Sequence, residues 1–430
     1  MRNQTNLRRV RGRVGALAAV AVLMPALTAC DNFFQVENPD VIDAATVDPV
    51  ADGTVFSRSA FQTFAVAYGS GYIVYTAWFT NEAWVGDTYP TRNEYGRRFI
   101  DQMNTSTAPD LWTPLTRSIA QGEAVIEILE GQTGQELNVA RAAFTSGYAL
   151  VLQAEGFCAG TMVQPGGVPG PRMTSQELLA KAIERFDKAM SAGGATTGTE
   201  AASIVTGAKV GKGRALLDLG RKTEAVAAVS GVATSYAFNV PYVDDASSRG
   251  RLGNGVYYYS FGGLREALVV PPHYRSMNDP RVQWADAGKF SQDGELRLYT
   301  QKKYPAWNSP IRLASGLEAR YIEAEANLSA ASTLTFINER RAAGGQAAVS
   351  TTNTTELLAY LMEQKSRDFW LEGMRMGDWR RNPNAVPNIL PPGNNYYKPQ
   401  LGDVQNQMCM PLPYAECNAN PNMPKPCTQS

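Results

Sequence analysis

The sequence predicts a mainly α-helical protein: a repeat scaffold of antiparallel helix pairs into which irregular, loop-rich segments are inserted. Apolar residues recur at helical spacing through most of residues 110–236 and 312–381. That spacing is lost over residues 237–311, where tyrosine, glycine and proline cluster. Hydrophobic residues make up 44% of the chain and charged residues 19%, a composition that favours a folded body with a sizeable core.

The helical part divides into segments with recognisable starts and ends. A first helix is expected over residues 54–68, and an irregular functional or surface loop over residues 84–100, where neither helical nor strand spacing emerges. Thr174 and Glu177 have the spacing of a capping box and predict a helix start. The main helical run is expected to hold successive helices over residues 111–131, 135–157, 175–192, 204–219 and 222–236.

Small residues mark the positions where paired helices would touch. They are Ala143, Gly147, Ala182, Ala189, Gly211, Ala215, Ala225 and Ala228. Antiparallel helix pairs with short loops and small contact residues are typical of tetratricopeptide-like units. The period of about 34 residues found in such repeats is not clean in this chain. The pattern therefore predicts tetratricopeptide-like packing without a strict repeat.

Residues 365–381, which read KSRDFWLEGMRMGDWRR, are predicted to form one helix with a ladder of charges. Lys365 and Asp368 are three residues apart, as are Glu372 and Arg375, and such offsets place opposite charges on one helix face. We interpret the ladder as a framework that fixes the last helix against the core. An ordinary surface helix with local salt links is the alternative.

The N-terminus has the features of a bacterial lipoprotein signal over residues 1–29. It combines five arginines and no acidic residue with the short apolar run Ala16–Leu27, which is too short to span a bilayer. Leu-Thr-Ala before Cys30 resembles a lipobox, so we expect lipidation of Cys30, a tether over residues 30–50 and one domain over residues 51–430. An ordinary signal with an incidental cysteine is the alternative.

Removing the predicted signal changes the charge balance. The whole chain has 40 basic and 40 acidic residues; without the five arginines, 35 face 40, a net charge of −5. A mildly acidic chain argues against nucleic-acid binding. Export permits disulfides among the four remaining cysteines, most simply Cys417–Cys427 or Cys409–Cys417, with Cys158 also available. The sequence does not choose the pairing.

Residues that carry catalysis are scarce. The only histidine, His273, sits among prolines and is interpreted as structural or solvated, and no nucleophile elbow, phosphate loop or zinc-protease motif occurs. Asp87 with Glu94, or Glu323 with Glu325, are the acid pairs a glycosidase would need, but acid pairs arise easily by chance in this chain. We therefore predict no enzyme, no cofactor and no metal.

Aromatic and polar residues mix in two stretches, 78–95 and 299–308. Sugars stack their apolar faces on Trp and Tyr rings while their hydroxyls hydrogen-bond to polar side chains. Core packing is the alternative for each ring. The candidate ligand-binding residues are Asn81, Trp84, Asp87, Tyr89, Tyr304 and Trp307.

A set of short motifs runs in order along the chain. Its members are Cys30, Asp279-Pro280-Arg281, Glu318–Ala326, Ile337–Arg341, the residues Glu372, Gly373, Arg375, Asp378 and Arg381, and Pro411-Leu412-Pro413 with Glu416 and Asn420-Pro421. The ordered set resembles the SusD/RagB family of outer-membrane nutrient-binding lipoproteins. The late helix of that family reads E-R-x-x-E-L-x-x-E-G-x-R-x-x-D-L-x-R, from which this chain departs at Gln364–Lys365, Asp368–Phe369 and Trp379.

The resemblance implies a SusD-like tetratricopeptide scaffold, with 237–311 as a loop-rich insertion on the ligand side and 382–430 as an extended tail. It implies a lipid-anchored outer-membrane protein at the cell surface that captures an oligosaccharide. The cargo would pass to a SusC-like TonB-dependent transporter. The resemblance also favours Asn81, Trp84 and Tyr89 as ligand-binding residues, because they follow the first helix and the ligand site of the family includes the loop at that place. Alternatives are a peptide-binding member of the family, a tetratricopeptide-like scaffolding lipoprotein without small ligand, and a surface hydrolase.

Overall fold

The computed structural model describes residues 48, 50–164, 168–261, 264–425 and 427. The predicted signal, the predicted lipidation site Cys30 and nearly all of the predicted tether lie outside these residues. Pro49–Ser430 forms one compact unit, which is the part analysed below. In the described part of the chain, no helix is long and apolar enough to cross a membrane.

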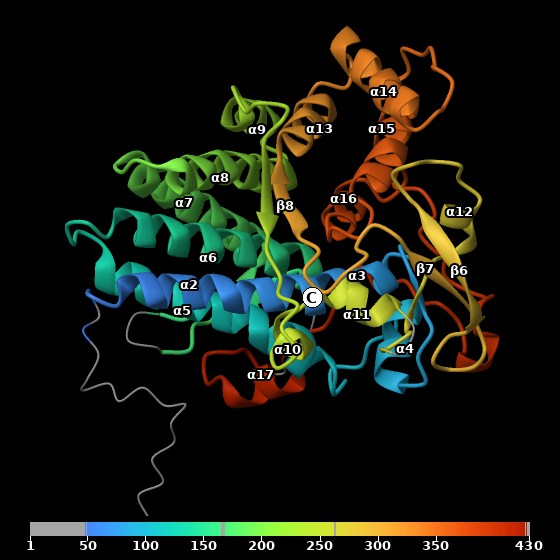
Figure 1. The fold of residues 1–430 in the computed structure, drawn as a ribbon, viewed down its shortest axis with the longest axis horizontal. Helices are drawn as coiled ribbons and strands as arrows, with labels where there is room; N and C mark the ends of the chain where they lie inside the picture. Colours follow the sequence, from blue (N-terminus) through green and yellow to red (C-terminus); the bar gives the residue numbers. More distant parts are fainter. Residues whose placement is uncertain (1–47, 49, 165–167, 262–263, 426, 428–430) are drawn as a thin grey trace, which may run out of the picture. The chain divides into compact units, whose positions relative to one another are not determined.

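The predicted class is confirmed, because helices dominate the described chain and each packs against the next (Figure 1). α2 packs on α5 and α6, and α6, α7, α8 and α9 follow as a stack of neighbours. α6 is the central member, buried along nearly its whole length. Their bounds are α2 Gly53–Val66, α5 Thr113–Leu129, α6 Glu136–Phe157, α7 Ser175–Gly194, α8 Thr199–Asp218 and α9 Lys222–Val229.

Small residues allow the close approach of these helices, as the sequence indicated. A Cβ atom on Gly211 of α8 would lie 2.4 Å from a ring atom of Phe186 in α7, and one on Gly147 of α6 would meet the same ring at 2.8 Å. The capping box before α7 is present: Glu177 N donates to Thr174 Oγ1 over 3.3 Å, and Thr174 N donates to the Glu177 carboxylate over 2.7 Å.

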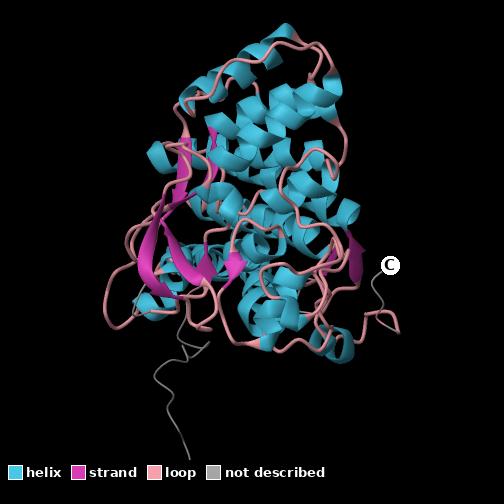
Figure 2. Cartoon of the chain, turned by 90° about the vertical axis from the view of Figure 1, so that its right-hand side faces the viewer, coloured by secondary structure: helices cyan, strands magenta, loops and turns pink. Residues whose placement is uncertain are grey.

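Strands form only two-stranded antiparallel sheets, drawn in magenta in Figure 2. They pair as β1 Trp84–Val85 with β5 Leu268–Val269, β2 Ala159–Thr161 with β3 Arg172–Thr174, β4 Ala237–Val240 with β8 Ile311–Ser315, and β6 Trp284–Phe290 with β7 Arg297–Gln301. The β4–β8 pair joins the two ends of the loop-rich insertion. Between them lie the short helices α10 Arg249–Leu252, α11 Gly255–Ser260 and α12 Pro272–Arg275.

Two segments near the first helix differ from expectation. α2 continues through a π-helical segment, Ala67–Tyr72, into α3, Ile73–Phe79, so that the helical path is longer than predicted. Residues 84–100, expected to be irregular, contain β1 and α4, Pro90–Arg97. α4 escaped notice because it is polar throughout; proline at its first position and side-chain bonds from Asn93 support its start.

The single helix predicted over residues 365–381 is wrong. α15, Thr354–Asp368, ends at Asp368, and α16, Arg375–Arg381, begins after a break in which Leu371 and Gly373 have φ values of 58° and 72°. Left-handed φ values end a helix. α15 packs with α13, Gly316–Ala326, and α14, Ala331–Ala343, whereas α16 packs with α6 and α3.

The expected charge ladder is replaced by pairs with distant residues. Lys365 Nζ lies 2.6 Å from Asp378 Oδ1 across the break, while Glu372 pairs with Lys303 and Arg312 at 2.5 and 2.9 Å. Lys365, Glu372 and Asp378 are almost wholly removed from solvent, while Lys303 and Arg312 are partly buried. Tertiary pairing of buried charges therefore overrides the local spacing seen in the sequence.

The tail after residue 381 is not wholly extended. It contains a 3₁₀ turn, Pro399–Leu401, and α17, Tyr414–Ala419. Two disulfides fasten it: Cys417–Cys427, one of the two simplest pairings, and Cys158–Cys409, which links the end of α6 to the tail across 251 residues.

Candidate functional site

Rings and guanidinium groups form one chain of contacts on the loop-rich insertion and the segment after α3. We call this set the aromatic strip, and it consists of Tyr89, Arg92, Tyr257, Tyr258, Tyr259, Phe261, Arg265 and Trp307. The β1–β5 ladder brings its parts together, because it pairs the strand before Tyr89 with the strand that follows α11. Gly86 N extends this ladder by donating to Ala267 O over 2.8 Å.

At one end, Tyr89 is 47% exposed and has two arginines beside its ring. The guanidinium carbons of Arg92 and Arg265 lie 4.6 and 4.7 Å from the ring centroid. Arg92 continues the chain, since its Nη2 donates to Tyr259 Oη over 3.3 Å. Cation–π contacts of this kind hold a ring in place while leaving part of it open.

Asp87 pairs through its buried carboxylate with both Arg92 and Arg265. Its side chain is fully buried, with Oδ2 2.5 Å from Arg92 Nη1 and 3.6 Å from Arg265 Nε, and Oδ1 accepts from Tyr89 N over 2.9 Å. The carboxylate thus orients three groups of the strip without reaching solvent. We interpret Asp87 as a positioning residue rather than one that touches a ligand.

At the other end, the rings of Tyr258 and Trp307 stack with 27° between their planes and 5.6 Å between centroids. Tyr259 links this pair to Arg92, with its ring 5.2 Å from that of Tyr258. Tyr257 contacts Trp307 at 5.4 Å and Phe261 at 4.8 Å. The strip therefore runs without interruption from Tyr89 to Phe261.

Asn254 fixes the position of this second end. Its side-chain oxygen accepts from Tyr257 N over 2.9 Å and caps α11. Its backbone N donates to Trp307 O over 2.7 Å, and its side-chain nitrogen donates to Ser309 O over 2.8 Å. One buried amide thereby joins the tyrosine run to the segment that carries Trp307. Arg249 adds a guanidinium 5.5 Å from the Trp307 ring.

The predicted residues divide between the strip and other places. Tyr89 and Trp307 belong to the strip, and Asp87 lies beneath it. Trp84 is 9% exposed, the same fraction as Trp307, but its partners lie outside the strip. It stacks on Tyr397 at 4.7 Å with 7° between planes, and its Nε1 donates to Asn81 Oδ1 over 2.9 Å.

Asn81 and Tyr304 have structural partners. Asn81 Nδ2 donates to Asn388 O over 2.7 Å, and the buried Tyr304 donates its hydroxyl to Leu371 O over 3.2 Å. Beside Trp84, Tyr396 is the open ring, 58% exposed.

Sequence reasoning missed most of the strip. Tyr257, Tyr258 and Tyr259 were interpreted only as part of a region of loops and short strands. Arg92 was noted only as one of the polar residues of the stretch 78–95, and Arg265 carried no pattern. The available signal was the run of three tyrosines directly after Asn254, a residue that caps helices. A helix start within a loop-rich segment places successive rings on different sides, so that they reach different neighbours.

The histidine and the carboxylates that catalysis would use are either buried without a partner or hydrogen-bonded to other side chains. Burial and the nearby charge of Arg375 lower the pKa of His273 to about 3, and its Nε2 is buried without a partner. Glu94 accepts from Asn104 Nδ2 over 2.6 Å, and Glu325 is paired with Arg381 at 3.0 Å. Among the residues that the structure describes, no three metal-ligating side chains gather.

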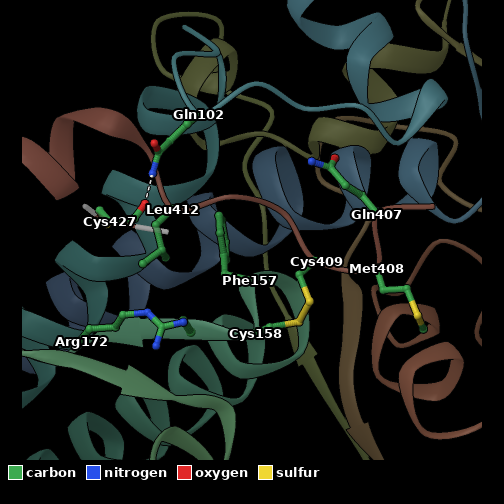
Figure 3. A pocket seen from close by; sticks show the side chains of 10 residues that line it. Gln102, Phe157, Cys158, Arg172, Gln407, Met408, Cys409, Leu412 and Cys427 are labelled. Carbon is green, nitrogen blue, oxygen red and sulfur yellow. Dashed lines mark hydrogen bonds between the residues drawn. A yellow bond between two sulfur atoms is a disulfide. The ribbon is translucent and has the colours of Figure 1, made fainter. Parts of the chain in front are cut away.

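A separate cavity of about 260 Å³ lies between the end of α6 and the tail (Figure 3). The Cys158–Cys409 disulfide forms part of its wall, together with Phe157 and Leu412. Gln102 fastens the tail there by donating to Cys427 O over 2.9 Å. No residue of the aromatic strip lines this cavity.

No protein-family model and no curated protein matches this sequence. Solved structures do match the fold. A SusD superfamily protein from Bacteroides vulgatus is 16% identical with a TM-score of 0.66, and the alignment covers 88% of this chain and 98% of that one.

Two further matches carry a ligand in their names. A laminarin-binding SusD-like protein is 11% identical with a TM-score of 0.67, covering 87% of this chain and 98% of its own. A surface glycan-binding protein A from Bacteroides thetaiotaomicron, solved with laminarihexaose, is 14% identical with a TM-score of 0.63, covering 86% and 98%. At these identities the likeness concerns the fold, and the chain has the SusD-like fold.

Proposed function

We propose that this chain is a cell-surface lipoprotein of the SusD/RagB type that captures an oligosaccharide and passes it to a SusC-like TonB-dependent outer-membrane transporter. The SusD-like fold and the glycan-binding names of two structural neighbours support the choice of ligand class. The lipobox-like segment before Cys30 supports attachment to a membrane through lipid chains. Binding without turnover fits the isolated histidine and the paired carboxylates.

The aromatic strip is the observation that carries this proposal. Its more open rings, the 47% exposed Tyr89 and the half-buried Tyr257 and Tyr258, offer apolar area to the flat faces of sugar rings. Trp307 and Tyr259 are 9% and 8% exposed and hold these rings in place through ring contacts. The guanidinium groups of Arg92 and Arg265 and the hydroxyls of the tyrosines can donate hydrogen bonds to the hydroxyl oxygens of a sugar. Asp87 already balances part of the arginine charge at 2.5 and 3.6 Å, so the strip also suits a neutral ligand.

Calorimetric titration with oligosaccharides, β-glucan fragments among them, tests the proposal. Trp307→Ala should weaken binding by about tenfold or more, equivalent to about 1.4 kcal/mol. The matched control is Tyr304→Phe, which removes one buried hydroxyl and leaves the strip intact. Binding of peptides but of no glycan would replace the carbohydrate with a peptide cargo, and absence of both would overturn ligand capture.

The transport step has its own test. The full-length lipoprotein, purified from its host membrane, should bring down a TonB-dependent barrel encoded beside it, and Cys30→Ala should remove the protein from the membrane fraction. Retention of the Cys30→Ala variant in the membrane would contradict the proposed anchor. A barrel that copurifies equally with an unrelated lipoprotein would contradict the proposed partnership.

A further inference from the structure

A small cavity lies at the break between α15 and α16, and α16 stands beside α3 in Figure 1. Its volume of about 10 Å³ is roughly the space that one water molecule needs. It is lined by Glu82, Met362, Lys365, Ser366, Phe369, Met374, Arg375, Asp378 and Val386. Charged side chains and apolar side chains therefore share the wall of a space of molecular size.

Two of the lining side chains each have a buried polar atom without a hydrogen-bond partner. Glu82 Oε1 accepts from Leu371 N over 3.3 Å, but Oε2 has none. Arg375 Nε donates to Thr80 O over 3.1 Å and Nη2 donates to Pro387 O, but Nη1 has none. Both residues are at least 96% removed from solvent. Buried polar atoms of this kind are bonded in native proteins, to ordered water where protein offers nothing.

We propose that the cavity binds one ordered water molecule, which donates to Glu82 Oε2 and accepts from Arg375 Nη1. A water molecule has two donors and two acceptor sites, so one molecule satisfies both atoms and keeps one of each. Lys365, which also lines the cavity, has three donors and uses one toward Asp378 at 2.6 Å. It is the natural third partner.

The charges around the cavity favour water over an ion. The two acidic side chains, Glu82 and Asp378, are matched by two basic ones, Lys365 and Arg375. The lining therefore has no excess charge that would attract a cation or an anion. Burial raises the pKa of Glu82 to about 7, so this carboxylate takes up a proton near neutral pH. Water serves as partner in both states, because it donates to the carboxylate and accepts from the acid.

This water would complete the seam between the helix break and the end of α3. Trp370 Nε1 already donates to Glu82 O over 3.1 Å, and Arg375 reaches Thr80 O. The water adds a hydrogen-bonded link between the same two segments, residues 80–82 and 370–375, where the side chains of Glu82 and Arg375 form no direct hydrogen bond. It is thus a structural component of the break rather than a solvent molecule that happens to be trapped.

A crystal structure of the protein at a resolution that shows ordered water is the direct test. We expect one density peak within hydrogen-bond distance of Glu82 Oε2 and Arg375 Nη1. The Ser366→Ala variant should retain the peak, since that hydroxyl already bonds to Glu363 O at 2.8 Å, whereas Glu82→Leu should lose it. A direct Glu82–Arg375 contact with no peak between them would overturn the proposal.

Solution measurements give a second readout that needs no crystal. Magnetic relaxation dispersion counts water molecules with long residence times, and Glu82→Leu should lose one of them relative to the wild type and to Ser366→Ala. An unchanged count in a folded Glu82→Leu protein would show that the cavity holds no such water. If Glu82→Leu does not fold, the wild-type crystal structure alone decides.

Discussion

Lys365 Nζ and Asp378 Oδ1 lie 2.6 Å apart across a break in the backbone, although the sequence places them thirteen residues apart in what looks like one helix. Asp378 also accepts from Arg381 over 2.6 Å, and Lys365 has Glu325 at 3.9 Å. The four groups are largely buried. Together they fasten α16 to the scaffold.

Removing one member of this cluster should destabilise the fold. Asp378→Asn leaves buried positive charge without its partner, a change that costs about 3–5 kcal/mol. Denaturant unfolding measures it. Glu184→Gln, which breaks an exposed pair with Lys181, serves as control and should cost less than about 1 kcal/mol. A cost at Asp378 no larger than the control would show that the cluster contributes nothing to stability.

Arg375→Ala separates the framework from the ligand site. Arg375 bonds to Thr80 O and Pro387 O and touches no member of the aromatic strip, so the variant should melt at a lower temperature and keep its glycan affinity. Thermal unfolding and calorimetric titration of the same sample measure both. Loss of binding in a fully folded Arg375→Ala protein would reverse the roles assigned to these residues.

Asp87→Asn should change which ligands bind. The amide cannot balance Arg92 and Arg265, so neutral-glycan affinity should fall as Tyr89 loses its support, while affinity for uronic-acid oligosaccharides should rise and become salt-dependent. Titrations at low and high salt detect this. Asp187→Asn, at a partly exposed pair with Lys212 on the helical scaffold, should leave the preference unchanged. An unaltered preference in Asp87→Asn would refute its positioning role.

The two disulfides should differ in their effect on stability. In the chain-entropy account, Cys158–Cys409 stabilises by about 5 kcal/mol and the short Cys417–Cys427 loop by about 3 kcal/mol. Double Cys→Ala variants of each pair, unfolded in denaturant without reductant, test the order. Equal costs for the two pairs would show that the length of the closed loop does not govern their contribution.

Stability should fall as pH rises from about 5 to 8. Burial raises the pKa of Glu82 and of Glu318 from 4.5 to about 7, so between these values the folded chain holds protons that the unfolded chain has released. Each such shift corresponds to up to about 3 kcal/mol. Glu318→Gln should flatten the profile measured by denaturant unfolding. A profile that rises over this range would contradict the assignment.

Much of the scaffold could be predicted because its signals are local. Helical spacing located α5 to α8 to within a few residues, and Thr174 with Glu177 located the start of α7. α9 ends at Val229, well before the expected residue 236, because Ser230 leaves the helical conformation and Gly231 has a left-handed φ of 74°. The break at 369–374 was invisible because its cause is tertiary: Glu372 is bound by Lys303 and Arg312 from a distant part of the chain.

The candidate site was only partly predictable for the same reason. Tyr89 and Trp307 were found from composition, which identifies rings but not their neighbours. Trp84 has the same local context, yet Tyr397 covers it from more than three hundred residues away. The contact between Tyr258 and Trp307 likewise depends on Asn254, whose three hydrogen bonds no local pattern reveals.

The β4–β8 ladder brings the two ends of the loop-rich insertion together. Val240 pairs with Ile311, so the excursion between them leaves the scaffold and returns to it at neighbouring points. A segment with adjacent ends can change length or sequence at little cost to the helices that support it. Exchange of residues 241–310 between proteins of this fold should therefore transfer much of the surface that carries the aromatic strip, provided that Arg281 and Lys303, which pair with Asp368 and Glu372 at the break between α15 and α16, are kept.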